Sequence, residues 1–384
     1  MKDIYLLGST GSIGVQTLDI IREHPEHFHI RALACGQNIA LLQEQIEAFR
    51  PDFVSVLSEA DSIVLQKKYP EIRFGFGPRG LIEAATMNGN HPGLLVNALV
   101  GIAGLAPTVH ALEMGRDVAL ANKESLVVGG QIIHDTTHKT GAKIYCIDSE
   151  HSGIWQCLAG EDKDYIKRVW ITSSGGAFRD LKRSELDQVT PEAAMNHPNW
   201  QMGAKITIDS ATMMNKAFEI AEAHWLFDID YDCIRPIMHR ESIVHALVEF
   251  IDHSFKAHLS APDMHHAISY ALFGGVRKAG MQQPLALDQM ERLSFSPFDS
   301  VRYPLMDHAL RAYQTGHSLP AVLNAANEIA VSLFLKKKIR FLDIESIIIE
   351  ALEQHTLVHH PTLTQLIMID QDVKARISAH FFKD

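Results

Sequence analysis

The sequence is poor in cysteine and proline and has no excess of positive charge. Its four cysteines, among 384 residues, show no paired spacing. This argues against a disulfide framework and makes a reducing cytoplasm the expected compartment. Fifteen prolines, 24 glycines and 46% apolar residues exclude a disordered, collagen-like or low-complexity chain. The formal net charge of −11 argues against general nucleic-acid binding, which needs a basic surface.

One long stretch, between Glu83 and Glu113, contains no Asp, Glu, Lys or Arg. The stretch contains Asn97, Pro107 and several glycines, so we interpret it as a buried strand, a loop and a packed helix. No signal-peptide pattern is visible, because an apolar strand pattern begins by Ile4 with no basic segment before it. We therefore expect no membrane association.

The N-terminal part alternates short apolar runs with helical patterns, which predicts a parallel sheet with helices on both faces. Strands are expected near residues 3–8, 29–35, 53–57, 95–100, 117–121, 143–147 and 169–172, and helices near 12–23 and 41–49. A chain of 384 residues is too long for one ordinary core, so two or three domains are expected.

The pattern changes after Ile147. Residues 173–214 are rich in Ser, Gly, Pro, Asn and Thr, which is typical of a functional loop region. The following segments predict a helix over 211–226, strands within 235–260, and helices over 305–313, 321–335, 343–355 and 371–381. The last four suggest a small bundle. We therefore predict an α/β fold: a Rossmann-like parallel-sheet domain (1–148), an α+β catalytic domain with a flap loop (149–273), a linker (274–304) and a C-terminal helical bundle (305–384).

A glycine-rich turn, Gly8–Gly14, lies between the first predicted strand and the first predicted helix. Glycines let the backbone approach a pyrophosphate, and the helix N-terminus supplies free N–H groups, so the turn predicts dinucleotide binding. The second strand ends in Cys35-Gly36-Gln37-Asn38 and lacks the acidic residue that holds the ribose of NAD. NADP is therefore favoured, although Gln37 is not basic.

An acidic motif, Asp148-Ser149-Glu150, follows a predicted strand of the parallel sheet. In extended chain the two carboxylates point to the same side, and they repel each other unless a cation lies between them. Oxygen ligands suit Mg²⁺ or Mn²⁺. The alternative is a pair of solvated acids at a strand end.

A second polar group spans Asp209 to Glu219, where a helix is expected to begin with Asp209 or Ser210 as its N-cap. Helical spacing places Asn215, Lys216 and Glu219 on one face, which suits hydroxyls, phosphate and a metal. The alternative is a solvent-facing helix held by salt bridges.

A lysine motif, Asn122-Lys123-Glu124, ends another strand of the parallel sheet and is expected at the same edge as Gly11 and Asp148. A lysine there can stabilise a substrate oxyanion. The alternative is an ordinary turn.

Together, these motifs resemble those of the 1-deoxy-D-xylulose 5-phosphate reductoisomerase family, the second enzymes of the methylerythritol phosphate route to isoprenoids. The matching segments are Gly8–Gly14, Ala121–Glu124, Ile147–Glu150, Ser174–Gly176, Asn196–Trp200 with Met202–Gly203, Asp209–Lys216 and Leu323–Glu328. The resemblance implies rearrangement of the substrate to a branched aldehyde phosphate, which NADPH reduces to 2-C-methyl-D-erythritol 4-phosphate. It also implies a homodimer.

The resemblance further implies roles for particular residues. A divalent ion (Mg²⁺, Mn²⁺ or Co²⁺) would bind Asp148, Glu150 and Glu219. The catalytic residues would be Lys123, Glu150, Glu219 and His197. Substrate would contact Lys123, Ser149, Glu150, Ser174, His197, Trp200, Ser210, Asn215, Lys216 and Glu219, and NADPH would contact Thr10, Gly11, Ser12, Ile13, Gly36, Gln37, Asn38, Asn122, Glu124 and Gly203. The loop around His197 to Gly203 would close as a flap, with Trp200 over the substrate.

Some positions depart from the family pattern. Ala177 stands where proline is common, His239-Arg240-Glu241-Ser242 replaces His-Pro-Gln-Ser, and Ala217-Phe218 replaces Gly-Leu. None of these changes removes a ligand or charge assigned above, but they can alter the stiffness of loops.

Other functions predict different features. A zinc hydrolase is disfavoured, because the 22 histidines include no His-Glu-x-x-His sequence. Another two-domain NADP oxidoreductase, such as a semialdehyde dehydrogenase, would need a nucleophilic cysteine, for which Cys146 and Cys157 are the candidates. An NADPH sensor without catalysis would not need three carboxylates. Metal dependence separates the reductoisomerase interpretation from the last two.

Overall fold

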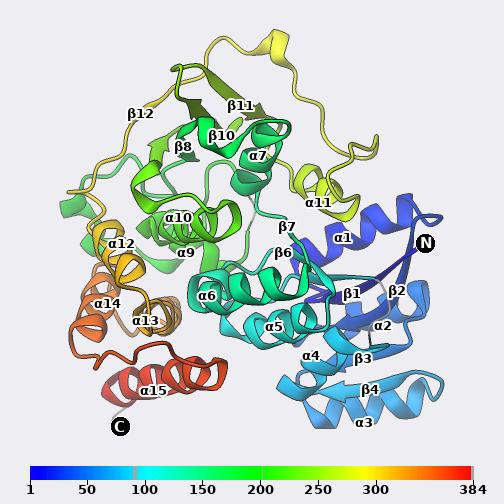
Figure 1. Ribbon diagram of the computed structural model, residues 1–384. Helices are drawn as coiled ribbons and strands as arrows, with labels where there is room; N and C mark the ends of the chain where they lie inside the picture. Colours follow the sequence, from blue (N-terminus) through cyan, green and yellow to red (C-terminus); the bar gives the residue numbers. More distant parts are fainter. Residues whose placement is uncertain (90–92, 201, 382–384) are drawn as a thin grey trace. The chain divides into compact units, whose positions relative to one another are not determined.

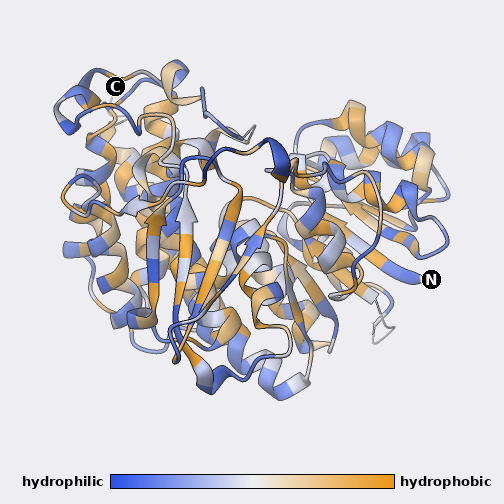
Figure 2. Ribbon diagram, turned by 90° about the horizontal axis from the view of Figure 1, so that it is seen from above, coloured by the Kyte–Doolittle hydropathy of each residue, from blue (hydrophilic) through white to orange (hydrophobic). Residues whose placement is uncertain are grey.

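The computed structural model describes residues 1–89, 93–200 and 202–381, and the chain divides into two compact units (Figure 1). The first unit comprises residues 1–126, 130–152 and 263–283, and the second comprises residues 127–129, 153–262 and 284–384. Apolar stretches, orange in Figure 2, run along strands of both sheets. The functional domain boundaries predicted above stay a prediction.

The first unit is built on a seven-stranded sheet in the order β4-β3-β2-β1-β5-β6-β7. The strands are β1 (Lys2–Leu7), β2 (Phe28–Ala34), β3 (Phe53–Val56), β4 (Arg73–Phe76), β5 (Gly93–Asn97), β6 (Asp117–Leu120) and β7 (Ile144–Cys146). Neighbouring strands pair in parallel. Strand order reverses between β1 and β5, and ligands of such sheets bind outside the carboxyl ends at this switch point.

Helices of the first unit accompany this sheet. They are α1 (Ser12–Glu23), α2 (Ile39–Phe49), α3 (Glu59–Lys68), α4 (Gly77–Thr86), α5 (Leu105–Glu113), α6 (Lys123–Thr140) and α11 (His265–Leu272). A 3₁₀ turn, η1 (Gly101–Gly104), precedes α5. Although α11 comes late in the chain, its residues Ile268 and Leu272 share one buried cluster with Ile4 and Leu18. This packing places residues 263–283 with the first unit.

The second unit contains a mixed five-stranded sheet in the order β11-β10-β8-β9-β12. Its strands are β8 (Ile166–Ser173), β9 (Ile234–Met238), β10 (Val244–Phe250), β11 (Phe255–Leu259) and β12 (Ser296–Pro297). Strands β8 and β9 are parallel, whereas the other pairs are antiparallel. The predicted linker therefore contributes the short edge strand β12.

Helices make up the rest of the second unit. They are α8 (Pro191–Ala194), α9 (Ala204–Thr212), α10 (Met214–Phe227), α12 (Leu305–Thr315), α13 (Leu319–Leu335), α14 (Asp343–Glu353) and α15 (Leu363–Phe381), with 3₁₀ turns η2 (Lys163–Tyr165), η3 (Arg183–Gln188), η4 (Tyr231–Cys233) and η5 (Leu287–Gln289). Most of α13 is buried, against α14 and α15. Helix α7 (Ser149–Leu158) begins in the first unit and continues in the second.

The predicted fold class is confirmed, and the stretch between Glu83 and Glu113 forms β5, η1 and α5 as expected. Among the helices of the described residues, none has both the length and the apolar character that a membrane crossing requires. Strand β4 was not predicted, and α15 begins eight residues before the predicted start at 371, at Leu363.

Three local predictions are wrong. The strand expected near 169–172 as part of the parallel sheet belongs instead to β8, in the mixed sheet of the second unit. The helix expected over 211–226 is two helices, because Met213 adopts a left-handed conformation (φ 65°) between α9 and α10. Asp209 and Ser210 therefore lie inside α9 and do not cap a helix. The extended-chain argument for Asp148 and Glu150 also fails, since β7 ends at Cys146 and α7 begins at Ser149.

Candidate functional site

The glycine-rich turn between β1 and α1 depends on two glycines. Gly8 has a φ of +83°, and a Cβ there would lie 2.4 Å from the Ala98 carbonyl oxygen. A Cβ on Gly14 would lie 2.2 Å from the Gly8 carbonyl oxygen, so the turn packs without room for a side chain. Gly11 is the N-cap of α1 and provides no side-chain hydrogen bond. The first turn of α1 therefore presents backbone N–H groups, the arrangement that favours a phosphate.

The predicted cofactor residues after β2 fill different roles. Asn38 is the N-cap of α2, and its Oδ1 accepts a hydrogen bond from the Leu41 backbone N–H at 3.2 Å. Gly36 and Gln37 are exposed, and among the described residues no heavy atom lies within 4 Å of a Cβ built on Gly36. This turn can therefore receive part of a ligand.

Asn122, the N-cap of α6, has a structural role besides the predicted one. Its buried side-chain amide donates to the carbonyl oxygens of Leu99 and Gly101, each at 3.0 Å, and to Glu124 Oε2 at 2.9 Å. Asn97, which the sequence analysis did not select, donates to the Gly104 carbonyl oxygen at 2.9 Å. Together these two asparagines hold the loop after β5. Asn97 could have been selected from the sequence because it is an asparagine at the end of an apolar strand.

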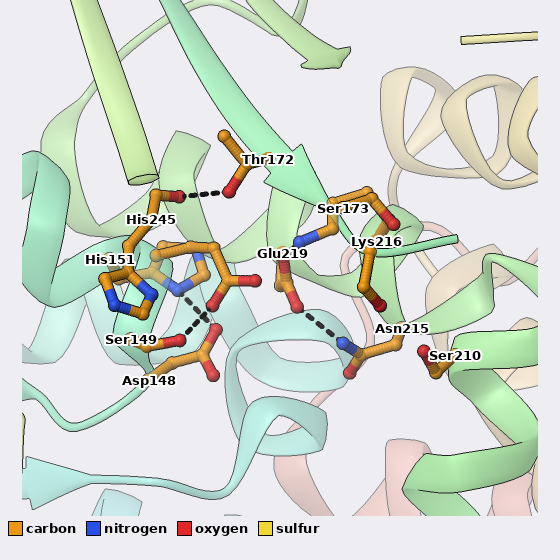
Figure 3. A network of polar contacts seen from close by, with 12 residues as sticks. Asp148, Ser149, His151, Thr172, Ser173, Ser210, Asn215, Lys216, Glu219 and His245 are labelled. Atoms are coloured by element: carbon orange, nitrogen blue, oxygen red, sulfur yellow. Dashed lines mark hydrogen bonds and ion pairs between the residues drawn. The ribbon is translucent and has the colours of Figure 1, made fainter. Parts of the chain in front are cut away.

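Lys123 and Asp148 are brought together within the first unit (Figure 3 shows Asp148). Lys123 Nζ lies 2.6 Å from Asp148 Oδ2, and the fully buried His151 places Nδ1 2.9 Å from the same oxygen. Burial by itself raises the pKa of the Asp148 carboxyl, but Lys123 and His151 outweigh it and hold that pKa below its usual value. Asp148 is therefore ionised.

His151 was missed by the sequence analysis. The available signal was its position three residues after Asp148, one helical turn away. Ser149 and Glu150 form the first turn of α7, where the Ser149 hydroxyl donates to the Glu150 carboxylate. These oxygens follow the carboxyl end of β7, the edge at which sheets of this kind bind ligands.

Ser174, His197 and Ser210 come together within the second unit. His197 Nε2 lies 3.1 Å from Ser174 Oγ and 3.3 Å from Ser210 Oγ. The backbone N–H groups of Asn199 and Trp200 donate to His197 Nδ1 at 3.2 and 3.0 Å. Nδ1 is thus an acceptor, and the neutral ring carries its proton on Nε2.

The surroundings of His197 suit an anion. Burial, together with the nearby Arg179 guanidinium, lowers the pKa of His197 to about 4, so the ring is neutral near pH 7. Arg179 Nη1 also donates to the Ser174 carbonyl oxygen at 3.1 Å. Two hydroxyls, one imidazole N–H and an adjacent guanidinium form a group that can bind phosphate.

Asn215, Lys216 and Glu219 also come together, on one face of α10 (Figure 3). Asn215 Nδ2 donates to Glu219 Oε1 at 2.5 Å, and Lys216 forms an ion pair with the other carboxylate oxygen. Glu219 is fully buried and Lys216 nearly so. The alternative of a solvent-facing salt-bridged helix is therefore wrong.

The predicted flap is described except at position 201, which lies outside the described residues. The Trp200 and His245 rings have centroids 6.3 Å apart. Asn199 Nδ2 donates to the Arg240 carbonyl oxygen at 2.6 Å and to Ser242 Oγ at 2.7 Å. The segment 239–242, which differs from the family pattern, thus anchors the base of this loop.

The other changes in this tetrapeptide also make contacts. The Arg240 guanidinium pairs with Asp180 at 2.6 Å. The Glu241 carboxylate accepts hydrogen bonds from the Ser294 backbone N–H and hydroxyl, so it ties the linker segment to this loop. The structure offers no particular explanation of Ala177.

Several predicted residues belong to different units. Asp148 and Glu150 lie in the first unit and Glu219 in the second, and Gly203, the N-cap of α9, lies apart in sequence from the other cofactor residues. Whether the three carboxylates share one ion, and whether Gly203 joins the cofactor set, stay predictions.

Cys35 and Cys157 do not resemble catalytic nucleophiles. All four cysteines are free thiols. Burial raises the pKa of Cys157 to about 11 and that of Cys35 to about 12, whereas nucleophilic cysteines have lowered values. This disfavours an enzyme that uses Cys157 as its nucleophile.

Comparisons with known proteins point to one family. Residues 4–130 match the family described as 1-deoxy-D-xylulose 5-phosphate reductoisomerase, residues 144–227 match its C-terminal domain, and residues 259–376 match a DXP reductoisomerase C-terminal domain. The chain is 47% identical to the 1-deoxy-D-xylulose 5-phosphate reductoisomerase of Halalkalibacterium halodurans, over 98% of both proteins. It is 48% identical to that of Geobacillus sp. (strain WCH70), over 97% of this chain and 98% of the relative.

Solved structures agree. A DOX-P reductoisomerase in complex with NADPH, fosmidomycin and magnesium superposes with a TM-score of 0.94 at 36% identity, covering 99% of this chain and 98% of the other. The Zymomonas mobilis enzyme in complex with NADPH gives a TM-score of 0.91 at 34% identity, with full coverage of both chains. On this sequence and structural similarity, the chain belongs to the 1-deoxy-D-xylulose 5-phosphate reductoisomerase family.

Proposed function

We propose that this protein converts 1-deoxy-D-xylulose 5-phosphate into 2-C-methyl-D-erythritol 4-phosphate, using NADPH and a divalent metal, in non-mevalonate isoprenoid biosynthesis. The observation that carries the proposal lies within the second unit. There the hydroxyl–imidazole group of Ser174, His197 and Ser210 occurs together with the buried Lys216–Glu219 pair. A phosphorylated polyol needs both a phosphate site and polar groups for its hydroxyls.

The residues present fit a divalent cation. Asp148, Glu150 and Glu219 offer only oxygen donors, the chemistry that Mg²⁺ and Mn²⁺ prefer. Asp148 and Glu219 each already lie against a lysine ammonium, as buried carboxylates that require positive charge do. When bound, the ion polarises the substrate carbonyl as a Lewis acid.

The remaining polar residues bind and orient the substrate. Ser174, His197 and Ser210 hold the phosphate, while Ser149, Asn215 and Lys216 contact hydroxyl and carbonyl oxygens. Lys123 stabilises the oxyanion that develops as the carbon skeleton rearranges. Trp200 and the loop from 197 to 203 cover the aldehyde intermediate and exclude water.

The cofactor binds the glycine-rich turn through Thr10, Gly11, Ser12 and Ile13, with the turn of Gly36, Gln37 and Asn38 beside the ribose. Asn122, Glu124 and Gly203 complete the set. NADPH supplies a hydride to the aldehyde carbon, and a proton taken up on oxygen completes the alcohol. NADP is preferred to NAD because the turn directly after β2, residues 35–38, contains no acidic residue.

A homodimer and a cytoplasmic location complete the proposal. Strand β11 is an edge of the second sheet, and Phe255 on it is 53% exposed, with Leu259 also exposed. Such an edge is suited to pairing with a second copy of the chain. Four free thiols agree with a reducing compartment.

The first experiment is NADPH absorbance decay with 1-deoxy-D-xylulose 5-phosphate, in Mn²⁺ and then with a chelator added. We expect oxidation that depends on the metal and stops on chelation. NADPH binding is measured separately by fluorescence. If protein that binds NADPH oxidises none of it in Mg²⁺, Mn²⁺ or Co²⁺, the proposal is wrong and an NADPH sensor or another reductase replaces it.

A further inference from the structure

One motif shared with the family, Leu323–Glu328, has no part in the site described above. It lies in α13, the central helix of the C-terminal bundle. We propose that Asn327 in this motif is a positioning residue: through Asp209 it fixes helix α9, and thereby sets the affinity of the enzyme for the substrate's phosphate. The proposal rests on the proposed function and deepens it.

A buried carboxylate connects α13 to α9. Asn327 Nδ2 donates to Asp209 Oδ1 at 2.8 Å, and Lys205 Nζ lies 2.8 Å from Asp209 Oδ2. Asn327 is fully buried and Asp209 is 2% exposed. Lys205 belongs to α9 itself, one turn before Asp209, so the Asn327 amide is a contact that reaches this carboxylate from another helix. The aspartate is thus held by groups from both helices.

The position of Asp209 matters because Ser210 follows it. Ser210 Oγ lies 3.3 Å from His197 Nε2, within the phosphate-binding group. The loop that carries Ser174 packs on the same turn of α9, since a Cβ on Gly176 would lie 2.7 Å from the Ser210 carbonyl oxygen. With no free space at this contact, a shift of α9 moves two of the three phosphate-binding side chains.

Helix α13 is also held by α15. Asn324 Nδ2 donates to Glu328 Oε1 at 2.8 Å, and Lys374 of α15 lies 2.5 Å from Glu328 Oε2. Lys374 also pairs with Asp370 at 2.9 Å. Polar contacts therefore run from α15 through α13 to α9. This gives the C-terminal bundle a role in substrate binding besides its contribution to stability.

The chain offers a matched control for the test. Asn324 has the same side chain as Asn327, lies in the same helix and is also fully buried, but its amide bonds Glu328 of its own helix. Asn327→Ala and Asn324→Ala therefore remove the same atoms from the same bundle. Their melting temperatures show how much each change destabilises the fold.

The measurements are KM and kcat for 1-deoxy-D-xylulose 5-phosphate, Kd for NADPH, and Kd for inorganic phosphate by calorimetry. For Asn327→Ala we expect the KM for substrate and the Kd for phosphate to rise roughly tenfold, with kcat and NADPH binding changing less than about threefold. For Asn324→Ala we expect the Kd for phosphate to stay within about twofold. Equal effects of the two variants on phosphate binding, or no effect of Asn327→Ala, overturn the proposal.

A second pair of variants covers the case in which Asn327→Ala does not fold. Asp209→Asn keeps an oxygen that can accept from Asn327, whereas Asp209→Ala does not. We expect Asp209→Ala to raise the Kd for phosphate much more than Asp209→Asn does. Equal increases in the two variants contradict the proposal. Phosphate binding is measured without turnover. If the wild-type protein does not oxidise NADPH, the proposed function is wrong, but the phosphate-binding test of Asn327 can still be carried out.

Discussion

Two lysine–carboxylate pairs, Lys123–Asp148 in the first unit and Lys216–Glu219 in the second, are formed in different ways. Lys123 and Asp148 follow two neighbouring strands, β6 and β7, and meet because the sheet places them side by side. Lys216 and Glu219 are three residues apart in α10 and meet because of helical spacing alone. The Lys216–Glu219 pair can therefore be predicted from sequence spacing, whereas the Lys123–Asp148 pair can be predicted only if the strand order is known. We propose that one substrate-bound metal depends on both.

The largest expected effect comes from removing one charge of the second pair. Glu219→Gln should lower turnover roughly a thousandfold, because a lost metal ligand removes several kcal/mol of transition-state stabilisation. NADPH binding should stay near normal, since the glycine-rich turn belongs to the first unit. Steady-state rates and NADPH fluorescence titration measure the two effects.

Asp148→Asn is the matched change in the first pair. If both carboxylates serve one ion, the double variant should be little worse than either single variant. If the fold losses in turnover of the two single variants multiply in the double variant, the two pairs act independently. Loss of NADPH binding in Glu219→Gln would contradict the division of roles between the units.

Replacing the lysines should separate the two pairs by stability. Lys216→Met removes the ammonium that pairs with the fully buried Glu219 and should cost about 3–5 kcal/mol of unfolding free energy. Lys123→Met should cost less, because Asp148 keeps the His151 ring 2.9 Å away. Urea unfolding without metal measures both.

Mn²⁺ provides the control for this prediction. An ion that binds these carboxylates replaces the lost positive charge, so it should raise the melting temperature of both variants more than that of the wild type. Equal metal effects in all three proteins would argue against metal binding at Asp148 and Glu219.

A third change tests whether the glycine-rich turn, Gly8–Gly14, can be distorted without affecting metal binding at the Lys123–Asp148 pair of the same unit. Gly14→Ala should weaken NADPH binding roughly tenfold or more, because its Cβ would lie 2.2 Å from the Gly8 carbonyl oxygen and must displace the turn. Gly36→Ala is the control for folding alone, because its Cβ has open space among the described residues; it is no control for NADPH binding, since Gly36 belongs to the proposed cofactor site. Metal-induced stabilisation should be unchanged in both; its loss in Gly14→Ala would show that the turn and the carboxylate are coupled.

The sequence allowed the sheet of the first unit to be predicted well, because buried parallel strands are short apolar runs bounded by clear turns. Strand β4 was missed since Arg73–Phe76 lies at the sheet edge and lacks a buried apolar pattern. The break between α9 and α10 could not be predicted either. Met213 adopts a left-handed conformation that methionine rarely takes, and no glycine or proline marks it.

The site was predictable where chemistry follows from local spacing, as in Asn215, Lys216 and Glu219. It was not predictable where one residue depends on distant packing. The Asn327–Asp209 contact depends on which helix lies opposite, and periodicity does not contain that information. His151 and Asn97, by contrast, had local signals that were overlooked.

The smallest expected effect concerns a third lysine–carboxylate pair, Lys374 and Asp370 in α15, which carries no assigned ligand. Burial raises the pKa of Asp370 to about 6 despite Lys374, whereas the pKa of Asp148 is lowered. A lysine partner alone therefore does not determine whether a buried acid is ionised. The pKa of Asp370 in the folded protein is above the unfolded value of about 3.9. Protonation of Asp370 therefore adds to the free energy of unfolding at low pH, and this contribution is lost as pH rises through about 6.

Asp370→Asn should thus stabilise the fold by roughly 1–3 kcal/mol near pH 8 and by much less near pH 4.5, because the amide cannot ionise. Asp372→Asn, an exposed change in the same helix, removes the same formal charge and is the control for the change of charge. Denaturant unfolding of both variants at the two pH values measures the difference. If Asp370→Asn is destabilising at pH 8, the ion pair with Lys374 outweighs burial, and the pair in α15 would resemble Lys216–Glu219 more closely than its raised pKa indicates.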